Sequence, residues 1–175
     1  MSSPSDTETP ESVVELYGGN AEFDALVRKA LEHGIKMDAP SVLRIWHLPE
    51  IRTFFPDVKH GICWIDQGNA IAGYELMLKH IKEFEDVGID KEQLKELAEA
   101  ATIVGKDHGR QSKKRSGRVI LSLWFLGRPI AVVISVGSNG YVVGMNRGSL
   151  KECRKRAGLT EEELDTLLRQ NHFWS

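Results

Sequence analysis

Residues 118–143 read RVILSLWFLGRPIAVVISVGSNGYVV, and this stretch predicts the sheet around which the rest of the chain packs. Val119–Leu126 and Ile130–Val136 are rich in apolar and β-branched residues, which favour strands, and a glycine turn separates the two runs. The Asn-Gly pair at 139–140 supplies the positive φ angles that a tight turn requires. Tyr141–Val143 then forms a third apolar run. The stretch predicts a three-stranded antiparallel meander.

Amphipathic helices are predicted on both sides of these strands in the sequence. Apolar residues recur at helical spacing over residues 20–33, 68–88 and 90–105. Residues 149–156 form a basic helical stretch. Residues 160–169 begin with a Thr and a Glu at the spacing of a capping box. We therefore predict three helices before the strands and two after them.

This order of elements favours an α+β fold, with N-terminal helices on one face of a small antiparallel meander sheet and a C-terminal helix. Within it we expect a disordered acidic tail over residues 1–12, because this stretch has almost no large apolar side chain. An N-terminal helical extension follows over 13–67, and its prolines predict short helical turns over residues 40–55. The α+β core covers 68–146 and a C-terminal helical segment covers 147–175.

Basic charge is concentrated in one part of a chain whose formal net charge is −2. Residues 105–156 hold twelve Lys and Arg against only Asp107 and Glu152. Many of these cations fall in a predicted loop over residues 106–118 in front of the sheet. Clustered cations can hold a polyanion because they replace its condensed counterions, so the loop indicates RNA as a partner. The alternative is a solvated loop that keeps the protein soluble.

Other features exclude several classes of protein. Cys63 and Cys153 are the only cysteines and have no metal-site or disulfide spacing, so we expect no metal. No Walker loop, dinucleotide glycine motif, His-Glu-x-x-His or Gly-x-Ser-x-Gly motif is present, and no cofactor is expected. The N-terminus lacks a signal-peptide pattern and no apolar run approaches membrane-spanning length. We therefore expect a cytoplasmic protein that does not contact a membrane.

The remaining polar residues are those that a metal-independent ribonuclease needs: a proton acceptor, a proton donor and a cation for the phosphate. His80 is the first candidate, because imidazole exchanges protons near neutral pH and the spacing places it on the inward stripe of its helix. Arg118 opens the first predicted strand, where its guanidinium can grip phosphate. The alternatives are a histidine at the edge of the core and an arginine in an edge-strand ion pair. His108, in the basic loop, is a second candidate histidine.

A hydroxyl group near the exit of the second strand can hydrogen-bond a phosphate. Ser135 and Ser138 both qualify, and Ser138 is the predicted catalytic residue of the two. A Ser-Asn-Gly turn without a chemical role is the alternative. Further side chains are predicted to bind substrate around these positions: Lys79, Arg110, Gln111, Lys113, Lys114 and Arg115.

Two segments together resemble a known family. Residues 73–84, GYELMLKHIKEF, precede a second helix, a Gly-Arg-Gln loop and strands that end in VGSNGYVVG at 136–144. This pattern resembles the phage-associated members of the barnase/EndoU/colicin E5/RelE-like (BECR) nuclease superfamily, over about residues 68–146. The resemblance implies a metal-independent endoribonuclease, often a phage-borne or toxin module, with His80, Arg118 and Ser138 as site residues. A second histidine expected in the first helix is absent, because Leu76 stands in its place.

The sequence is compatible with three functions. The first is RNA cleavage, which requires His80, Arg118 and Ser138 to converge within reach of one phosphate. The second is a non-catalytic module that binds nucleic acid or an acidic protein through the basic loop. The third is an effector or inhibitor that docks on a protein through the aromatic-rich segment Trp46–Trp64.

Overall fold

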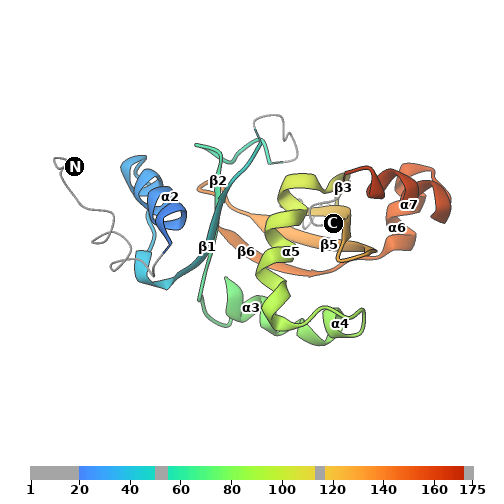
Figure 1. Cartoon of the computed structure of the whole chain (residues 1–175), viewed down its shortest axis with the longest axis horizontal. Coiled ribbons are helices and arrows are strands. Elements are labelled where there is room, and N and C mark those ends of the chain that lie inside the picture. The colour runs from blue at the N-terminus through green and yellow to red at the C-terminus, as the bar shows by residue number, and fades with distance from the viewer. Residues whose placement is uncertain (1–19, 50–54, 113–116, 172–175) are drawn as a thin grey trace.

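The computed structural model describes residues 20–49, 55–112 and 117–171. This part of the chain contains six α-helices and two antiparallel sheets, of two and four strands, which confirms the predicted α+β class (Figure 1). Within the same residues, no helix combines the length and the apolar content that crossing a bilayer requires.

The larger sheet is a meander of four antiparallel strands in the order β3-β4-β5-β6. Its strands are β3 (Lys106–Arg110), β4 (Arg118–Phe125), β5 (Arg128–Val136) and β6 (Val142–Arg147). The last three confirm the predicted meander. The loop predicted over residues 106–118 is wrong for 106–110, because these residues pair with the free edge of β4. Their polar sequence has little strand propensity, so the pairing comes from tertiary context.

One face of the sheet packs against α5 (Lys91–Val104), the long helix predicted over residues 90–105. Asp90 caps this helix, and its side chain and that of Gln93 form a reciprocal capping box. Alternate residues of β4 and β5 lie in the same buried cluster as the apolar residues of α5. These strand residues are Val119, Leu121, Leu123 and Phe125 on β4 with Ile130, Val132 and Ile134 on β5.

The opposite face, called the second face below, packs against α6 (Leu150–Ala157) and α7 (Glu161–Arg169). Ile120 and Val133 from the sheet join Cys153 of α6 and two leucines of α7 in a separate apolar cluster. The prediction that helices cover one face only is therefore wrong. The nearly continuous apolar sequence of β4 and β5 is typical of strands buried on both faces.

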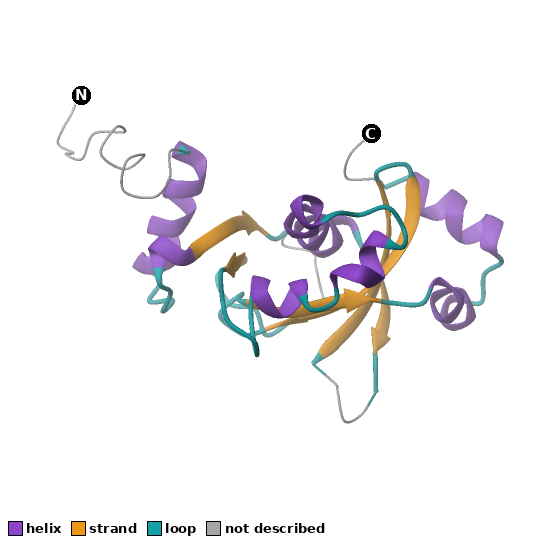
Figure 2. Cartoon of the chain, turned by 90° about the horizontal axis from the view of Figure 1, so that it is seen from below, coloured by secondary structure: helices purple, strands orange, loops and turns teal. Residues whose placement is uncertain are grey.

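Two short helices, α3 (Tyr74–Leu78) and α4 (Ile81–Glu85), pack along β6 (Figure 2). The single helix predicted over residues 68–88 is therefore wrong. The break falls at His80, whose φ of −103° and ψ of 11° leave the helical region. Met77 and Phe84 are fully buried on either side of the break and keep the spacing of one helix face. The apolar periodicity consequently gives no sign of the break.

The N-terminal part consists of α2 (Ala21–Glu32), a 3₁₀ turn (Ala39–Ser41), β1 (Val42–His47) and β2 (Ile62–Asp66). The α2 helix is confirmed, with Asn20 Oδ1 accepting a hydrogen bond from the backbone N–H of Phe23. The helical turns predicted over residues 40–55 are wrong for 42–47, because this run pairs with β2. Residues 50–54 lie outside the described part of the chain.

The aromatic residues of this part lie in the core. Trp46 and Trp64 are each 3% exposed, and Phe55 is also buried. Trp46 Nε1 donates to Thr102 Oγ1 at 2.8 Å, which ties β1 to α5. These side chains therefore stabilise the fold and present no docking surface, and the predicted role of the Trp46–Trp64 segment in binding a partner is wrong for them.

The two sheets are joined where β2 meets the turn between β5 and β6. The backbone N–H of Trp64 donates to the carbonyl of Gly140 at 3.0 Å, and Tyr141 Oη donates to Asp66 Oδ1 at 2.8 Å. Gly140 has a φ of 87°, and a Cβ there would lie 1.8 Å from the carbonyl oxygen of Ile62. The junction therefore depends on glycine at this position.

Candidate functional site

A polar row crosses one end of the second face. Arg118 of β4 pairs directly with Ser135 of β5, which pairs with Gly144 of β6. Directly paired residues share a face, and the next row on this face contains Ile120 and Val133. Neighbouring strands lie about 4.8 Å apart, so the row places a guanidinium and a hydroxyl group side by side.

A cavity of about 580 Å³ lies over the row that contains Ile120 and Val133. These two side chains supply apolar surface, and four separate segments supply polar walls. The polar lining comes from the following residues: Glu83 of α4 and Asp86 just after it, Gln111 after β3, Arg147 at the end of β6, Ser149 just before α6, and Glu152 and Arg156 of α6. A cavity with an apolar base and a polar rim is typical of a small-molecule or nucleotide subsite.

Glu83, which lines this cavity, forms a polar pair with His80. His80 Nδ1 lies 3.2 Å from Glu83 Oε2, with the two side chains 39% and 46% exposed. Glu83 Oε1 also accepts a hydrogen bond from the backbone N–H of Arg147. Leu76 Cδ2 would lie 3.0 Å from a Cβ at Gly144, so Leu76 covers that position. His80 follows Leu76 by four residues, about one helical turn.

His80 is 39% exposed and contacts Glu83, a lining residue, but does not itself line the cavity, and its predicted position on the inward stripe is wrong. The break between the two helices exposes the imidazole. Among the described residues, Nε2 of His80 has no hydrogen-bond partner, whereas Nδ1 contacts Glu83. A glutamate three residues after a helical histidine is a spacing at which side chains meet, so the sequence contained a signal for this pair.

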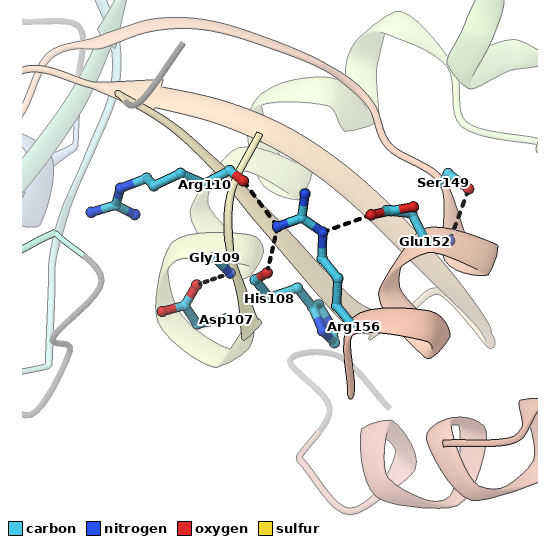
Figure 3. A network of polar contacts seen from close by, with 7 residues as sticks. All are labelled: Asp107, His108, Gly109, Arg110, Ser149, Glu152 and Arg156. Atoms are coloured by element: carbon cyan, nitrogen blue, oxygen red, sulfur yellow. Dashed lines mark hydrogen bonds and ion pairs between the residues drawn. The ribbon is translucent and has the colours of Figure 1, made fainter. Parts of the chain in front are cut away.

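Arg156 of α6 fixes the end of β3 (Figure 3). Its Nη1 donates to the carbonyl oxygens of His108 and Arg110 at 3.1 and 2.9 Å, and its Nε donates to Glu152 Oε2 at 2.8 Å. The hydrogen bond from Arg156 lowers the pKa of Glu152. Gly109, at a φ of 94°, gives the strand the irregular register that turns both carbonyls toward Arg156. The arrangement holds the β3 end beside the cavity.

His108 is buried on the second face rather than exposed in a loop. Its Nε2 lies 2.6 Å from Ser122 Oγ of β4. Burial lowers the pKa of His108 to about 4, and the nearby charges of Lys106 and Arg156 act in the same direction. Ser122 has no exposed surface. The pair is therefore a neutral buried hydrogen bond that stabilises the sheet, and it offers no proton to a substrate.

The structure also describes three residues that were predicted to bind substrate: Gln111, Arg110 and Lys79. Gln111 lies beside Arg118, because its backbone N–H donates to the Arg118 carbonyl at 2.9 Å. Arg110 precedes Gln111 at the end of β3. Lys79 is exposed at the end of α3, next to His80 in the sequence. Lys113, Lys114 and Arg115 lie outside the described residues.

Ser138 lies in the turn between β5 and β6, where its side chain is exposed and its carbonyl accepts a hydrogen bond from the backbone N–H of Lys59. The register places Ser135, and not Ser138, directly opposite Arg118. Sequence reasoning missed a further set of residues around the cavity: Glu83, Asp86, Arg147, Ser149, Glu152 and Arg156. Within the described ranges, no three His, Cys, Asp or Glu side chains are grouped so that they could hold a metal ion.

A scan against models of known protein families finds no match to this chain, and a search of curated proteins also finds none.

Proposed function

We propose that this chain is a metal-independent endoribonuclease, with its active site on the second face of the four-stranded sheet. The observation that carries the proposal is the His80–Glu83 pair, of which Glu83 lines the cavity of about 580 Å³. A carboxylate and an imidazole within hydrogen-bond reach of each other provide the proton acceptor and the proton donor that RNA cleavage requires. The BECR-like sequence pattern supports the same activity.

In the proposed reaction, Glu83 takes the proton of the ribose 2′-OH while the 2′ oxygen attacks the adjacent phosphorus. His80, protonated at Nε2, gives its proton to the leaving 5′ oxygen as the P–O5′ bond breaks. The products are a 2′,3′-cyclic phosphate and a free 5′-OH. Because Glu83 Oε1 is bound by the Arg147 N–H, the carboxylate keeps a fixed orientation during the transfer.

Arg118 supplies positive charge to the phosphate in this proposal. It is partly buried at the start of β4, and its backbone is paired on both sides, so its position is better defined than that of a loop cation. A guanidinium can donate two parallel hydrogen bonds to a phosphate whose negative charge grows in the transition state. Ser135, directly opposite, can donate a third. The role of Ser138 remains a prediction.

RNA as the substrate is supported by the distribution of charge around this face. Arg110 ends β3 and Gln111 follows it, and the sequence continues through Lys113, Lys114 and Arg115 to Arg118. Clustered cations attract a polyanion and release its counterions. Lys79 adds a cation beside His80.

The proposal is tested by incubating the protein with total RNA and with tRNA in EDTA, and by following cleavage on denaturing gels. We expect cleavage by the wild type, and a loss of about 100-fold or more in His80→Ala and in Glu83→Gln. Glu85→Gln is the matched control, because Glu85 lies on the same helix but does not line the cavity.

Equal cleavage by the wild type and both site variants would place catalysis elsewhere. No cleavage by any of them, together with a salt-dependent mobility shift, would favour the non-catalytic nucleic-acid-binding module.

A further inference from the structure

The outer side of α6 is a charged surface that neither the fold nor the proposed chemistry uses. The helix carries one carboxylate, that of Glu152, and four cations: Lys151, Arg154, Lys155 and Arg156. Arg156 Nε donates to Glu152 Oε2 at 2.8 Å, so these two charges satisfy each other. The positive charge that α6 presents to solvent therefore comes from the other three cations.

The spacing of these residues places Lys151 and Lys155 on the side of α6 that points away from the sheet. Cys153, halfway between them, is fully buried against the second face. Because a helix turns through about 100° per residue, positions two residues before and after Cys153 lie nearly opposite it. Both lysines are exposed, and within the described part of the chain neither has a hydrogen-bond or ion-pair partner. We call Lys151 and Lys155 the α6 ridge.

Helix stability gives no reason for this pair of lysines. Lys151 is the second residue of α6, and the helix dipole disfavours a cation near the N-terminus. Lys155 follows Lys151 by four residues, a spacing at which like charges destabilise a helix. The ridge therefore weakens the helix, and a ligand of opposite charge relieves the repulsion.

The ridge continues from one wall of the cavity. Glu152 and Arg156, which line the cavity, each follow one of the two ridge lysines directly in the sequence. Arg156 also binds the carbonyls of His108 and Arg110, which holds α6 against the end of β3 (Figure 3). A chain of nucleotides that leaves the cavity on this side meets the ridge within the width of one helix, about 10 Å.

The chemistry of the ridge fits a polyanion better than a protein. Lysine ammonium groups are point charges that hold phosphates without fixing their orientation, which suits a backbone of repeating phosphates. A protein interface also needs apolar or aromatic anchors. Among the described residues, the exposed large apolar side chains are Leu31, Ile71, Leu126 and Leu167, and none of them lies on α6.

We propose that the α6 ridge binds the phosphate backbone of single-stranded RNA outside the cleavage site, which rests on the proposed ribonuclease function. Lys151 and Lys155 each neutralise one phosphate of the nucleotides that continue beyond the scissile bond. Phosphate contacts carry no sequence information, so the ridge favours long RNA over short RNA and no base over another. A dinucleotide has a single phosphate, which the active site occupies.

The first test measures binding of a fluorescent RNA of about 12 nucleotides, a length within the site sizes of single-strand-binding domains. Its 2′-hydroxyls are methylated, which prevents cleavage, and the full chain is titrated at several salt concentrations. The variant combines Lys151→Gln with Lys155→Gln. Each lost contact reduces the slope of log K against log salt by about 0.7, so we expect a reduction of about 1.4. Between about 50 and 200 mM salt, the wild type then loses about sevenfold more affinity than the variant.

The matched control combines Lys29→Gln with Lys36→Gln, which changes the net charge by the same amount. Both lysines are exposed, on α2 and four residues after it, and α2 and α6 lie at opposite ends of the molecule (Figures 1 and 2). We expect this control to keep the wild-type slope. In urea denaturation we expect the ridge variant to be at least as stable as the wild type, because it loses a repulsive pair.

The second test compares kcat/KM for a dinucleotide and for an unmodified RNA of about 12 nucleotides. We expect the ridge variant to cleave the dinucleotide as the wild type does. For the longer RNA we expect its kcat/KM to fall below that of the wild type, by a factor that shrinks as the salt concentration is raised.

An unchanged salt slope in the ridge variant, or an equal change in the α2 control, would overturn the proposal and leave an acidic protein as the partner of opposite charge. An equal loss of kcat/KM on the dinucleotide and on the longer RNA would also overturn it, because the effect would then lie in the active site. If no RNA is cleaved but the slope falls only in the ridge variant, the ridge binds RNA and the proposed catalysis is wrong.

Discussion

The two faces of the four-stranded sheet are built from the same strands and differ in what they present. On the face toward α5, the alternate residues of β4 from Val119 to Phe125 and of β5 from Ile130 to Ile134 are apolar and buried. The second face mixes Ile120 and Val133 with Arg118, Ser122 and Ser135, and its covering helices leave a cavity. Strand alternation allows one face to hold the fold together while the other holds polar groups.

The two faces also differ in their polar side chains and in the hydrogen-bond partners of these side chains. On the α5 face, the apolar side chains need no partner, and close packing supplies the stability. On the second face, buried His108 is paired with Ser122, because an unpaired polar group would be costly, whereas the buried Gln111 Oε1 beside the cavity has no hydrogen-bond partner among the described residues. The polar groups that keep unused hydrogen-bonding capacity are those around the cavity.

The largest expected effect is a loss of stability from a truncation on the face toward α5. Leu121→Ala removes a fully buried side chain opposite α5, and we expect the free energy of unfolding to fall by about 2–5 kcal/mol. Urea denaturation at pH 7 measures this loss. A fall of less than 1 kcal/mol would show that this face repacks easily, and that its contribution to stability is smaller than argued.

The second prediction is a loss of RNA cleavage on the second face with the fold left intact. Arg118→Ala removes the proposed phosphate-binding guanidinium, and we expect RNA cleavage to fall by about 100- to 1,000-fold while the free energy of unfolding changes by about 1 kcal/mol or less. Cleavage rates and urea denaturation are compared on the same preparation. Arg128→Ala is the matched control, because Arg128 opens β5 at the far end of the sheet and contacts the carbonyl of Val87. Normal cleavage in Arg118→Ala would remove this residue from the site.

A third prediction concerns the pH dependence of the buried pair. Since the pKa of His108 is about 4 when folded, the unfolded chain binds a proton first as pH falls. Neutral His108 therefore makes its full contribution to the free energy of unfolding above about pH 6.5. This contribution falls as the pH is lowered from about 6.5 to about 4, by at most about 3 kcal/mol. Urea denaturation at several pH values, with His108→Gln as the comparison, measures this slope. An equal slope in both proteins would contradict the assignment.

The smallest expected effect sharpens the role of the Arg156 contacts. Arg156→Met keeps the apolar stem but removes the hydrogen bonds to two carbonyls of β3 and to Glu152, and we expect a loss of about 1–3 kcal/mol in stability. Amide hydrogen exchange should rise in β3 more than in β5. Unchanged exchange in β3 would show that pairing with β4 alone holds this strand.

Much of the fold was predictable where the signal is local. The strands β4 and β5 and the capped helices α5 and α7 follow from apolar runs, turn residues and capping boxes. The strands β1 and β3 were missed because their local signal is weak: prolines flank β1 and β3 is polar, and pairing with β2 and β4 decides their conformation. Of the site, His80 and Arg118 were singled out by residue type and position.

The cavity could not be predicted, for a related reason. Its lining joins Glu83 on α4, Gln111 after β3 and Glu152 on α6, which lie about 30 to 70 residues apart in the sequence. None of these residues stands out by itself. These residues come together only because α4 packs against β6 and α6 packs against the second face.

The junction at Gly140 has a consequence for how the molecule unfolds. Trp64 and Asp66 of the small sheet bind the β5–β6 turn through contacts that span about 75 residues of chain. Such distant contacts form only when both sheets are in place, and their loss exposes backbone groups on each side at once. Heat or urea should therefore melt the two sheets in a single cooperative transition, although they share no continuous hydrogen-bonded ladder.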